Sequence, residues 1–176
     1  MVVLIIGVPD SGKSQMAEDR AMELSQGEKK YYIATMIPFG EEGKRRIQKH
    51  RAMREGKGFE TIECPVNLGK MLSGINDLSE ATCLVECMSN LVGNEMHGDV
   101  KYGENELVEH IAGDMSRLCE AARNVVIVSN SFAKDDEGYD EDTRNYVRAM
   151  DLVNGRLKKL SDETYEFVDG NWTRTK

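Results

Sequence analysis

The sequence has few of the features that mark membrane-spanning or secreted proteins. Its 176 residues include three prolines and one tryptophan, and no apolar run approaches the roughly 18 residues that a membrane span requires. The first apolar stretch, residues 2–6, is short and has neither a basic leader nor a cleavage site, so we expect a strand there and not a signal peptide. We therefore expect a cytoplasmic protein with no membrane span.

Basic charge is also scarce. The chain has 23 lysines and arginines against 31 aspartates and glutamates, which gives a net charge of −8. An acidic protein repels nucleic-acid phosphates and anionic lipid, so we do not expect a nucleic-acid partner. A local basic cluster can still hold a small phosphorylated ligand.

The four cysteines, Cys64, Cys83, Cys87 and Cys119, include no Cys-x-x-Cys pair. Without a secretory signal, they are expected to be reduced thiols. Cys83 and Cys87 could share one face of a strand, which raises the possibility of a metal site. No second ligand pair has the spacing of a zinc site, so buried packing is the favoured interpretation.

Short apolar runs alternate with amphipathic segments along the whole chain, as expected for a single domain over residues 1–176. The repeated β-α-β order predicts a mostly parallel sheet flanked by helices. Strands are expected at 2–6, 31–34, 61–63, 83–87 and 125–128, with a closing hairpin of 165–168 and 172–175 around Asp169-Gly170-Asn171. Helices are expected at 14–25, 41–55, 66–75, 104–122 and 143–160. Two stretches are expected to be loops, 93–103 and the acidic run 134–142.

The segment Gly7-Val8-Pro9-Asp10-Ser11-Gly12-Lys13-Ser14 fits the pattern G-x-x-x-x-G-K-[ST]. Glycines let the backbone curl so that its N–H groups point at phosphate oxygens, and the helix that follows adds its positive dipole end. Lys13 would reach the β and γ phosphates, and the Ser14 hydroxyl would bind Mg²⁺. Because the motif joins an apolar strand to a helix, the sequence predicts a P-loop NTPase-like α/β fold that binds GTP or ATP with Mg²⁺.

A P-loop enzyme usually needs a carboxylate at the end of a neighbouring strand to hold Mg²⁺. Glu86 ends an apolar run and is the best candidate, although it could merely end the strand. Asp114 and Glu120 are expected on a helix and fit this role less well.

Arg46, His50 and Arg54 recur every four residues, so they share one helix face. One interpretation is a solvated helix face balanced by nearby glutamates. The other is a phosphate site, in which neighbouring cations keep the His50 imidazole neutral and nucleophilic and stabilise charge on a phosphorus under attack. Such a histidine could carry a nucleotidyl group.

With these motifs, the chain resembles the bifunctional adenosylcobinamide kinase / adenosylcobinamide-phosphate guanylyltransferase family of cobalamin biosynthesis. The family's phosphate loop matches at Gly7 and residues 11–14, and its Tyr-Ile-Ala-Thr strand stands at 32–35. Its Glu-x-x-x-Arg-Ile-x-x-His-Arg-x-x-Arg helix matches at Glu42, Arg46, Ile47, His50, Arg51 and Arg54. Further matches are Thr61 and Glu63, Val85-Glu86-Cys87, Asn94, 128–130 and 153–157.

The resemblance implies that the enzyme phosphorylates the aminopropanol hydroxyl of adenosylcobinamide, a corrinoid. It then takes GMP from GTP onto His50 and passes it to adenosylcobinamide phosphate. Lys13, Glu86 and His50 would be catalytic, Ser14 and Glu86 would bind Mg²⁺, and the protein would be a homotrimer. The nucleotide would contact Gly7, Val8, Pro9, Asp10, Ser11, Gly12, Lys13, Ser14, Thr35, Arg46, Arg51, Arg54 and Glu63.

The chain departs from the family pattern at two places that bear on function. Asp10 stands where the family has arginine, and Ser131-Phe132-Ala133 replaces Glu-Val-Gly after Asn130. Two alternatives therefore stay open. One is a P-loop kinase without the guanylyltransferase step, and the other is a non-catalytic nucleotide-binding protein. The acidic run Asp135–Asp142 could recruit a cation or basic partner, but a solvated loop is the simpler expectation.

Overall fold

A seven-stranded sheet forms the centre of the protein. In the computed structural model, which describes residues 1–133 and 136–176, the strand order is β3-β2-β4-β5-β1-β6-β7. Neighbouring strands pair in parallel except β6 and β7, which are antiparallel. The predicted sheet with an antiparallel C-terminal edge is confirmed. The strands are β1 (Val2–Gly7), β2 (Lys30–Ala34), β3 (Phe59–Glu63), β4 (Thr82–Glu86), β5 (Asn124–Asn130), β6 (Glu163–Val168) and β7 (Asn171–Arg174).

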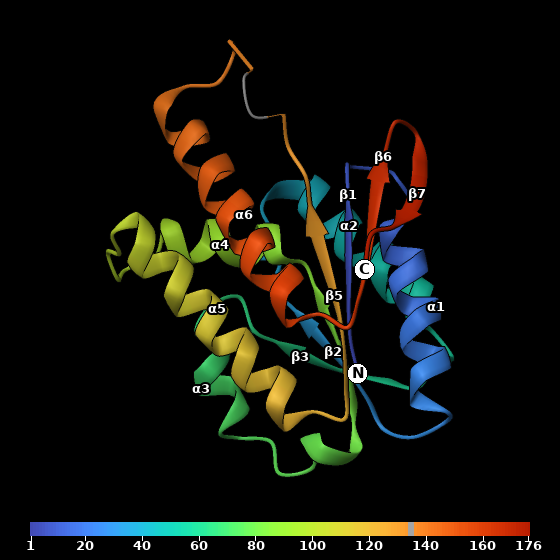
Figure 1. The fold of residues 1–176 in the computed structure, drawn as a ribbon. Helices are drawn as coiled ribbons and strands as arrows, with labels where there is room; N and C mark the ends of the chain where they lie inside the picture. Colours follow the sequence, from blue (N-terminus) through green and yellow to red (C-terminus); the bar gives the residue numbers. More distant parts are fainter. Residues whose placement is uncertain (134–135) are drawn as a thin grey trace.

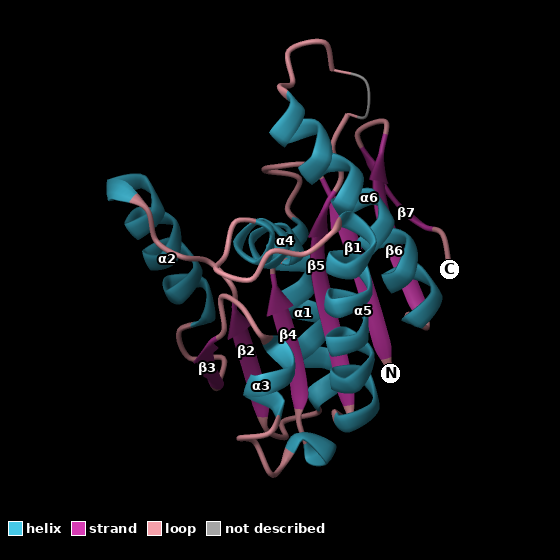
Figure 2. Cartoon of the chain, turned by 90° about the vertical axis from the view of Figure 1, so that its left-hand side faces the viewer, coloured by secondary structure: helices cyan, strands magenta, loops and turns pink. Residues whose placement is uncertain are grey.

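Helices cover both faces of this sheet (Figure 1). On one face, Ala17 and Ala21 of α1 pack against Val3 and Ile5 of β1. The opposite face of β1, with Leu4, belongs to the core that α4, α5 and α6 cover. Figure 2 shows α2 standing away from both layers, at the β3 side of the sheet. The helices are α1 (Lys13–Ser25), α2 (Gly40–Arg54), α3 (Leu68–Leu72), α4 (Met88–Met96), α5 (Glu104–Ala121) and α6 (Glu141–Leu160), with a short 3₁₀ helix at Leu78–Glu80.

Two parts of the element prediction are wrong. Helix α4 was not predicted, and its last residues were assigned to the loop 93–103. Polar residues and a glycine stand among its few apolar residues, yet Met88, Leu91 and Val92 are buried against the sheet. Helix α3 is also shorter than the predicted 66–75, because Asn67 has a positive φ of 54° and bounds the helix on its N-terminal side.

Cys83 and Cys87 do not share a face. Cys83 lies in the core beside α5 and α6, whereas Cys87 follows the end of β4 and packs with the core beneath α1. Burial raises the pKa of the Cys83 thiol to about 12, so this side chain is a protonated packing group. Both observations favour the packing interpretation over a metal site.

The acidic run was expected to be a loop. Lys134 and Asp135 lie outside the described residues. The last two residues of the run, Glu141 and Asp142, are the first two residues of α6. Asp140 caps that helix by accepting a hydrogen bond from the backbone N–H of Thr143 at 2.8 Å, a bond that lowers the pKa of the Asp140 carboxyl. In the described ranges 1–133 and 136–176, no helix is long and apolar enough to cross a membrane.

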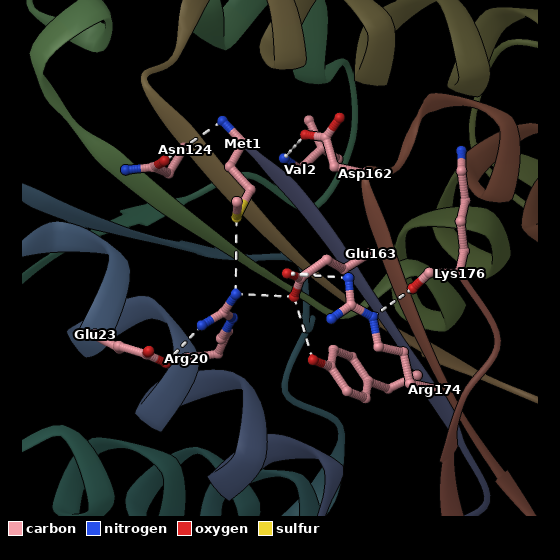
Figure 3. A network of polar contacts seen from close by, with 10 residues as sticks. Met1, Val2, Arg20, Glu23, Asn124, Asp162, Glu163, Arg174 and Lys176 are labelled. Atoms are coloured by element: carbon pink, nitrogen blue, oxygen red, sulfur yellow. Dashed lines mark hydrogen bonds and ion pairs between the residues drawn. The ribbon is translucent and has the colours of Figure 1, made fainter.

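A polar network fastens the edge hairpin to α1 and β1 (Figure 3). The Glu163 carboxylate lies 2.8 Å from the Arg20 guanidinium of α1 and 3.4 Å from that of Arg174 in β7. It also accepts a hydrogen bond from the Tyr165 hydroxyl at 3.2 Å. Because only 11% of the Glu163 side chain is exposed, its charge depends on these partners.

We expect the substitution Glu163→Gln to lower the free energy of unfolding by about 1–2 kcal/mol, since hydrogen bonds to a charged group are replaced by neutral ones. Urea titration followed by circular dichroism would measure the change. Glu23→Gln is the matched control, because Glu23 pairs with the same Arg20 but is 69% exposed. Its effect should stay below about 0.5 kcal/mol, and equal losses in the two variants would contradict the role given to Glu163.

Candidate functional site

A pocket lies where the carboxyl ends of β2, β4 and β5 meet the start of α1 and the inner face of α2. In open parallel sheets, ligands bind at this edge. The lining combines lysine, arginine and histidine side chains with carboxylates and amides. It is formed by Lys13, Ser14, Tyr32, Ala34, Met36, Arg46, Ile47, His50, Arg51, Arg54, Glu63, Glu86, Cys87, Ser89, Asn90 and Asn130.

The phosphate loop has a conformation that restricts its sequence. Gly12 has a φ of 83°, and Asp10 has a φ of 59°, which Asp tolerates better than most residues. A Cβ atom at Gly7 would lie 2.5 Å from Ser11 Oγ and 3.0 Å from the Trp172 ring. Trp172 of β7 also donates a hydrogen bond from its indole N–H to the Ser11 carbonyl at 3.2 Å. The edge hairpin therefore supports the loop from outside.

Lys13 directs its ammonium group back along this loop. Its Nζ donates to the Val8 carbonyl at 2.9 Å. Burial lowers the pKa of Lys13, while Cys87, Glu86 and Asp10 oppose that shift electrostatically. A partly buried ammonium group in a loop of backbone amides is suited to phosphate oxygens.

Glu86 is buried at the end of β4 and holds a hydroxyl on each carboxylate oxygen. The Ser14 hydroxyl donates to Oε1, and the Tyr32 hydroxyl donates to Oε2 at 3.1 Å. Burial raises the pKa of the Tyr32 hydroxyl, so this group stays a donor. Hydroxyl and carboxylate oxygens are ligands that Mg²⁺ accepts. Ser14 and Glu86 thus fit the magnesium position expected beside a P-loop.

Arg54 fastens the C-terminal turn of α2 over the sheet. Its guanidinium lies 3.3 Å from the centre of the Tyr32 ring, a cation–π contact, and donates to the His50 carbonyl at 2.8 Å. This turn brings His50 Nδ1 to 3.6 Å from Glu86 Oε1. An imidazole carried by a separate helix therefore lies beside the phosphate-loop residues.

The structure brings most of the expected side chains together but not all of them. Lys13, Ser14 and Glu86 line one pocket with Arg46, His50, Arg51, Arg54 and Glu63. Val8, Pro9 and Asp10 are exposed on the loop beside it. Thr35 lies outside the pocket, fully buried, with its hydroxyl donating to the Cys87 carbonyl at 2.8 Å. Asp114 does not line the pocket either, and its carboxylate accepts a hydrogen bond from the backbone N–H of Gly69 in α3.

Three further side chains line the pocket that were not among the expected site residues, although a simple signal points to them. Asn130 follows the apolar run of β5, and Ser89 and Asn90 come soon after the run of β4. Polar residues at the carboxyl ends of parallel strands are candidates for ligand binding. The Asn130 amide donates to the Ser89 hydroxyl at 2.8 Å, so these residues form one polar wall.

The sequence profile of the cobinamide kinase / cobinamide phosphate guanyltransferase family matches residues 3–174. The chain belongs to this family. Its phosphate loop, pocket and α2 all lie inside the matched range. No curated protein matches the sequence.

Solved structures with a similar fold include P-loop ATPases. The ATPase domain of G40P has a TM-score of 0.56 at 13% identity, covering 94% of this chain and 68% of that one. The flagellar accessory protein FlaH from Methanocaldococcus jannaschii has a TM-score of 0.51 at 11% identity, covering 98% and 75%. The ATP synthase subunit NeqB from Nanoarcheaum equitans has a TM-score of 0.57 at 8% identity, covering 96% and 45%. At these identities the likeness shows the fold alone, and it agrees with the predicted P-loop NTPase-like fold.

We expect the affinity for GTP to fall in alkaline solution because of Lys13. Its pKa in the free protein lies below the usual 10.5, whereas a bound triphosphate favours the ammonium form. Above that lowered pKa, binding must take up a proton, and the affinity falls by up to about tenfold per pH unit. Calorimetric titration of the wild type and Lys13→Met from about pH 7 to about pH 10 measures the effect. A constant ratio of the two affinities across this range would contradict it.

We expect the substitution Asp10→Asn to tighten nucleotide binding about two- to tenfold at low salt, because it removes a negative charge beside the phosphates. Asparagine tolerates the positive φ of this position. Glu23→Gln changes the net charge by the same amount on the exposed surface of α1 and should leave the affinity unchanged. Equal affinities for Asp10→Asn and wild type would show that Asp10 does not face bound phosphate.

Proposed function

We propose that the protein is an adenosylcobinamide kinase and adenosylcobinamide-phosphate guanylyltransferase in which His50 carries the guanylyl group. The observation that supports this proposal best is the position of His50. Its imidazole lies in the same pocket as Lys13 and Ser14, and its Nδ1 lies 3.6 Å from the Glu86 carboxylate. A solvated helix face would not place a half-buried histidine there.

In the kinase step, the phosphate loop and Lys13 hold the triphosphate, and the aminopropanol hydroxyl of adenosylcobinamide attacks the γ-phosphorus. As the new P–O bond forms, the bond from the γ-phosphorus to the oxygen that bridges it to the β-phosphorus breaks, the nucleoside diphosphate leaves, and the hydroxyl proton is released to solvent. Mg²⁺ at Ser14 and Glu86 would neutralise phosphate charge when bound. The residues of the chain act mainly by positioning the phosphates and by excluding water from the pocket.

In the guanylyl step, an imidazole nitrogen of His50 attacks the α-phosphorus of GTP. The P–N bond forms as the bond to the β-phosphate oxygen breaks, and pyrophosphate leaves. A phosphate oxygen of adenosylcobinamide phosphate then attacks the same phosphorus and returns the electron pair to the imidazole. Arg46 and Arg51 line this pocket and would stabilise negative charge on the phosphorus.

The geometry suggests other roles for three residues that were expected to contact the nucleotide, Arg51, Arg54 and Glu63. Arg54 is buried against Tyr32 and His50, so we assign it to positioning α2 and not to direct phosphate contact. Arg51 lies 3.6 Å from Glu63, and this exposed pair borders the open side of the pocket. The corrinoid would enter from that side, where α2 stands away from the helix layers (Figure 2).

Incubation with Mg²⁺ and GTP labelled at the α-phosphate, followed by denaturation, should leave a label on the wild type. A phosphoramidate is acid-labile and alkali-stable, and the label should be absent in His50→Ala. His97→Ala serves as the control, because His97 is exposed next to Asp142 and should keep full labelling. Transfer of γ-phosphate to cobinamide without a label would identify a kinase alone. Nucleotide binding with neither reaction would identify a non-catalytic protein.

A further inference from the structure

Glu18 is a buried charged residue to which the proposed function gives no role. It lies on α1, one turn beyond Ser14, and is 0% exposed. Lys57, in the turn after α2, holds its Oε2 at 2.7 Å. The other oxygen, Oε1, is buried and has no hydrogen-bond partner among the described residues. A buried carboxylate oxygen without a partner costs folding free energy, so this oxygen is a candidate to bind a ligand.

His50 has a second such atom. Its Nδ1 is buried and likewise has no hydrogen-bond partner in residues 1–133 and 136–176. Glu18, His50 and Glu86 each offer one ligand atom, and these three atoms lie within 4.8 Å of one another. Ligand atoms on a tetrahedral zinc ion, with bonds of about 2.1 Å, lie about 3.4 Å apart. The 3.6 Å between His50 Nδ1 and Glu86 Oε1 already matches that spacing.

Both carboxylates are oriented by an outer donor on the oxygen that faces away from this group. Lys57 holds Oε2 of Glu18, and the Tyr32 hydroxyl holds Oε2 of Glu86 at 3.1 Å. Metal-binding carboxylates are typically fixed in this way by hydrogen bonds to their second oxygen. In Glu18 the other oxygen, Oε1, has no partner among the described residues. In Glu86 the other oxygen, Oε1, accepts from the Ser14 hydroxyl and lies 3.6 Å from His50 Nδ1.

Two cations of the pocket, Lys13 and Arg54, are directed at other partners. Lys13 Nζ donates to the Val8 carbonyl, and the Arg54 guanidinium lies over the Tyr32 ring and donates to the His50 carbonyl. Among the described residues, neither of these two cations forms an ion pair with Glu18 or Glu86.

We propose that Glu18, His50 and Glu86 form a site for one divalent transition-metal ion of the zinc type. One imidazole nitrogen with two carboxylate oxygens suits Zn²⁺ and its neighbours, whereas Mg²⁺ takes oxygen ligands. This site differs from the magnesium position, which would use Ser14 and Glu86, but the two positions have Glu86 in common. The ion and magnesium nucleotide therefore compete for the protein.

The metal also removes the nucleophile, a consequence that rests on the proposed function. A neutral imidazole has one nitrogen with a free lone pair and one that carries hydrogen. A metal ion on Nδ1 of His50 occupies that lone pair and leaves the proton on Nε2. Neither nitrogen can then attack GTP, so an occupied site holds the enzyme in an inactive form.

Titration of the metal-free full-length protein with Co²⁺, without nucleotide, tests the site directly. We expect a visible absorption band that saturates at one ion per chain. Glu18→Gln and His50→Ala should each weaken the binding at least about tenfold, and His97→Ala, at an exposed histidine–carboxylate pair, should not. Circular dichroism checks that the variants fold. If Glu18→Gln does not fold, His50→Ala still provides the test. A band absent from wild type, or unchanged in a folded ligand variant, overturns the proposal.

Labelling with α-phosphate GTP tests the inhibition. Wild type preloaded with one equivalent of Zn²⁺ should be labelled at least about tenfold more slowly than zinc-free wild type, and the same preloading should slow Glu18→Gln much less. Equal labelling of Zn²⁺-loaded and zinc-free wild type would overturn the inhibitory role. Absence of label from the zinc-free wild type in the presence of Mg²⁺ would instead contradict the guanylyl-histidine, and the Co²⁺ titration would still decide the metal site.

Discussion

The buried carboxylate of Glu86 is the interaction on which the rest of the site depends. It stands at the carboxyl end of β4, next to β2 on one side and β5 on the other. From there it accepts hydrogen bonds from Ser14 of α1 and Tyr32 of β2 and faces His50 of α2. A charged group this deeply buried is stable only when its oxygens are satisfied. The phosphate-loop helix and the sheet are thereby bonded to one carboxylate, and the separate helix brings its histidine next to it.

The position of α2 follows from a similar constraint. Most of its side chains are exposed, so burial of apolar surface contributes little to holding it. Polar contacts to the sheet hold it instead, among them that of the Arg54 guanidinium over the Tyr32 ring of β2 and the Arg51–Glu63 ion pair to β3. A helix held by a few polar contacts can move more easily than one packed in a core. Under the proposed function, such a helix could bring its histidine first to a nucleotide and then to a corrinoid phosphate.

The fold was largely predictable because its signals are local. The continuous apolar run of β1 and the glycine spacing after it identify a strand, a phosphate loop and a helix within a few residues of one another. The short turn of the edge hairpin is local too, since Asp169 and Gly170 both have positive φ values, as a two-residue hairpin turn requires. Helix α4 was missed although Met88, Leu91 and Val92 recur at helical spacing. The helix has only nine residues, and the polar residues and glycine among them weaken that signal.

The site was only partly predictable because its polar contacts are not local. The spacing of Arg46, His50 and Arg54 on one helix face indicated His50, but nothing in the sequence places that histidine within reach of Glu86. Glu18 had a signal, a charge on the helix face that carries Ala17 and Ala21, but its meaning depends on Lys57, 39 positions away. The same pocket must attract phosphates and hold carboxylates. Three cations near these carboxylates have partners elsewhere in the fold, Val8 for Lys13, Tyr32 for Arg54 and Glu18 for Lys57. These pairings are set by tertiary contacts that no short motif records.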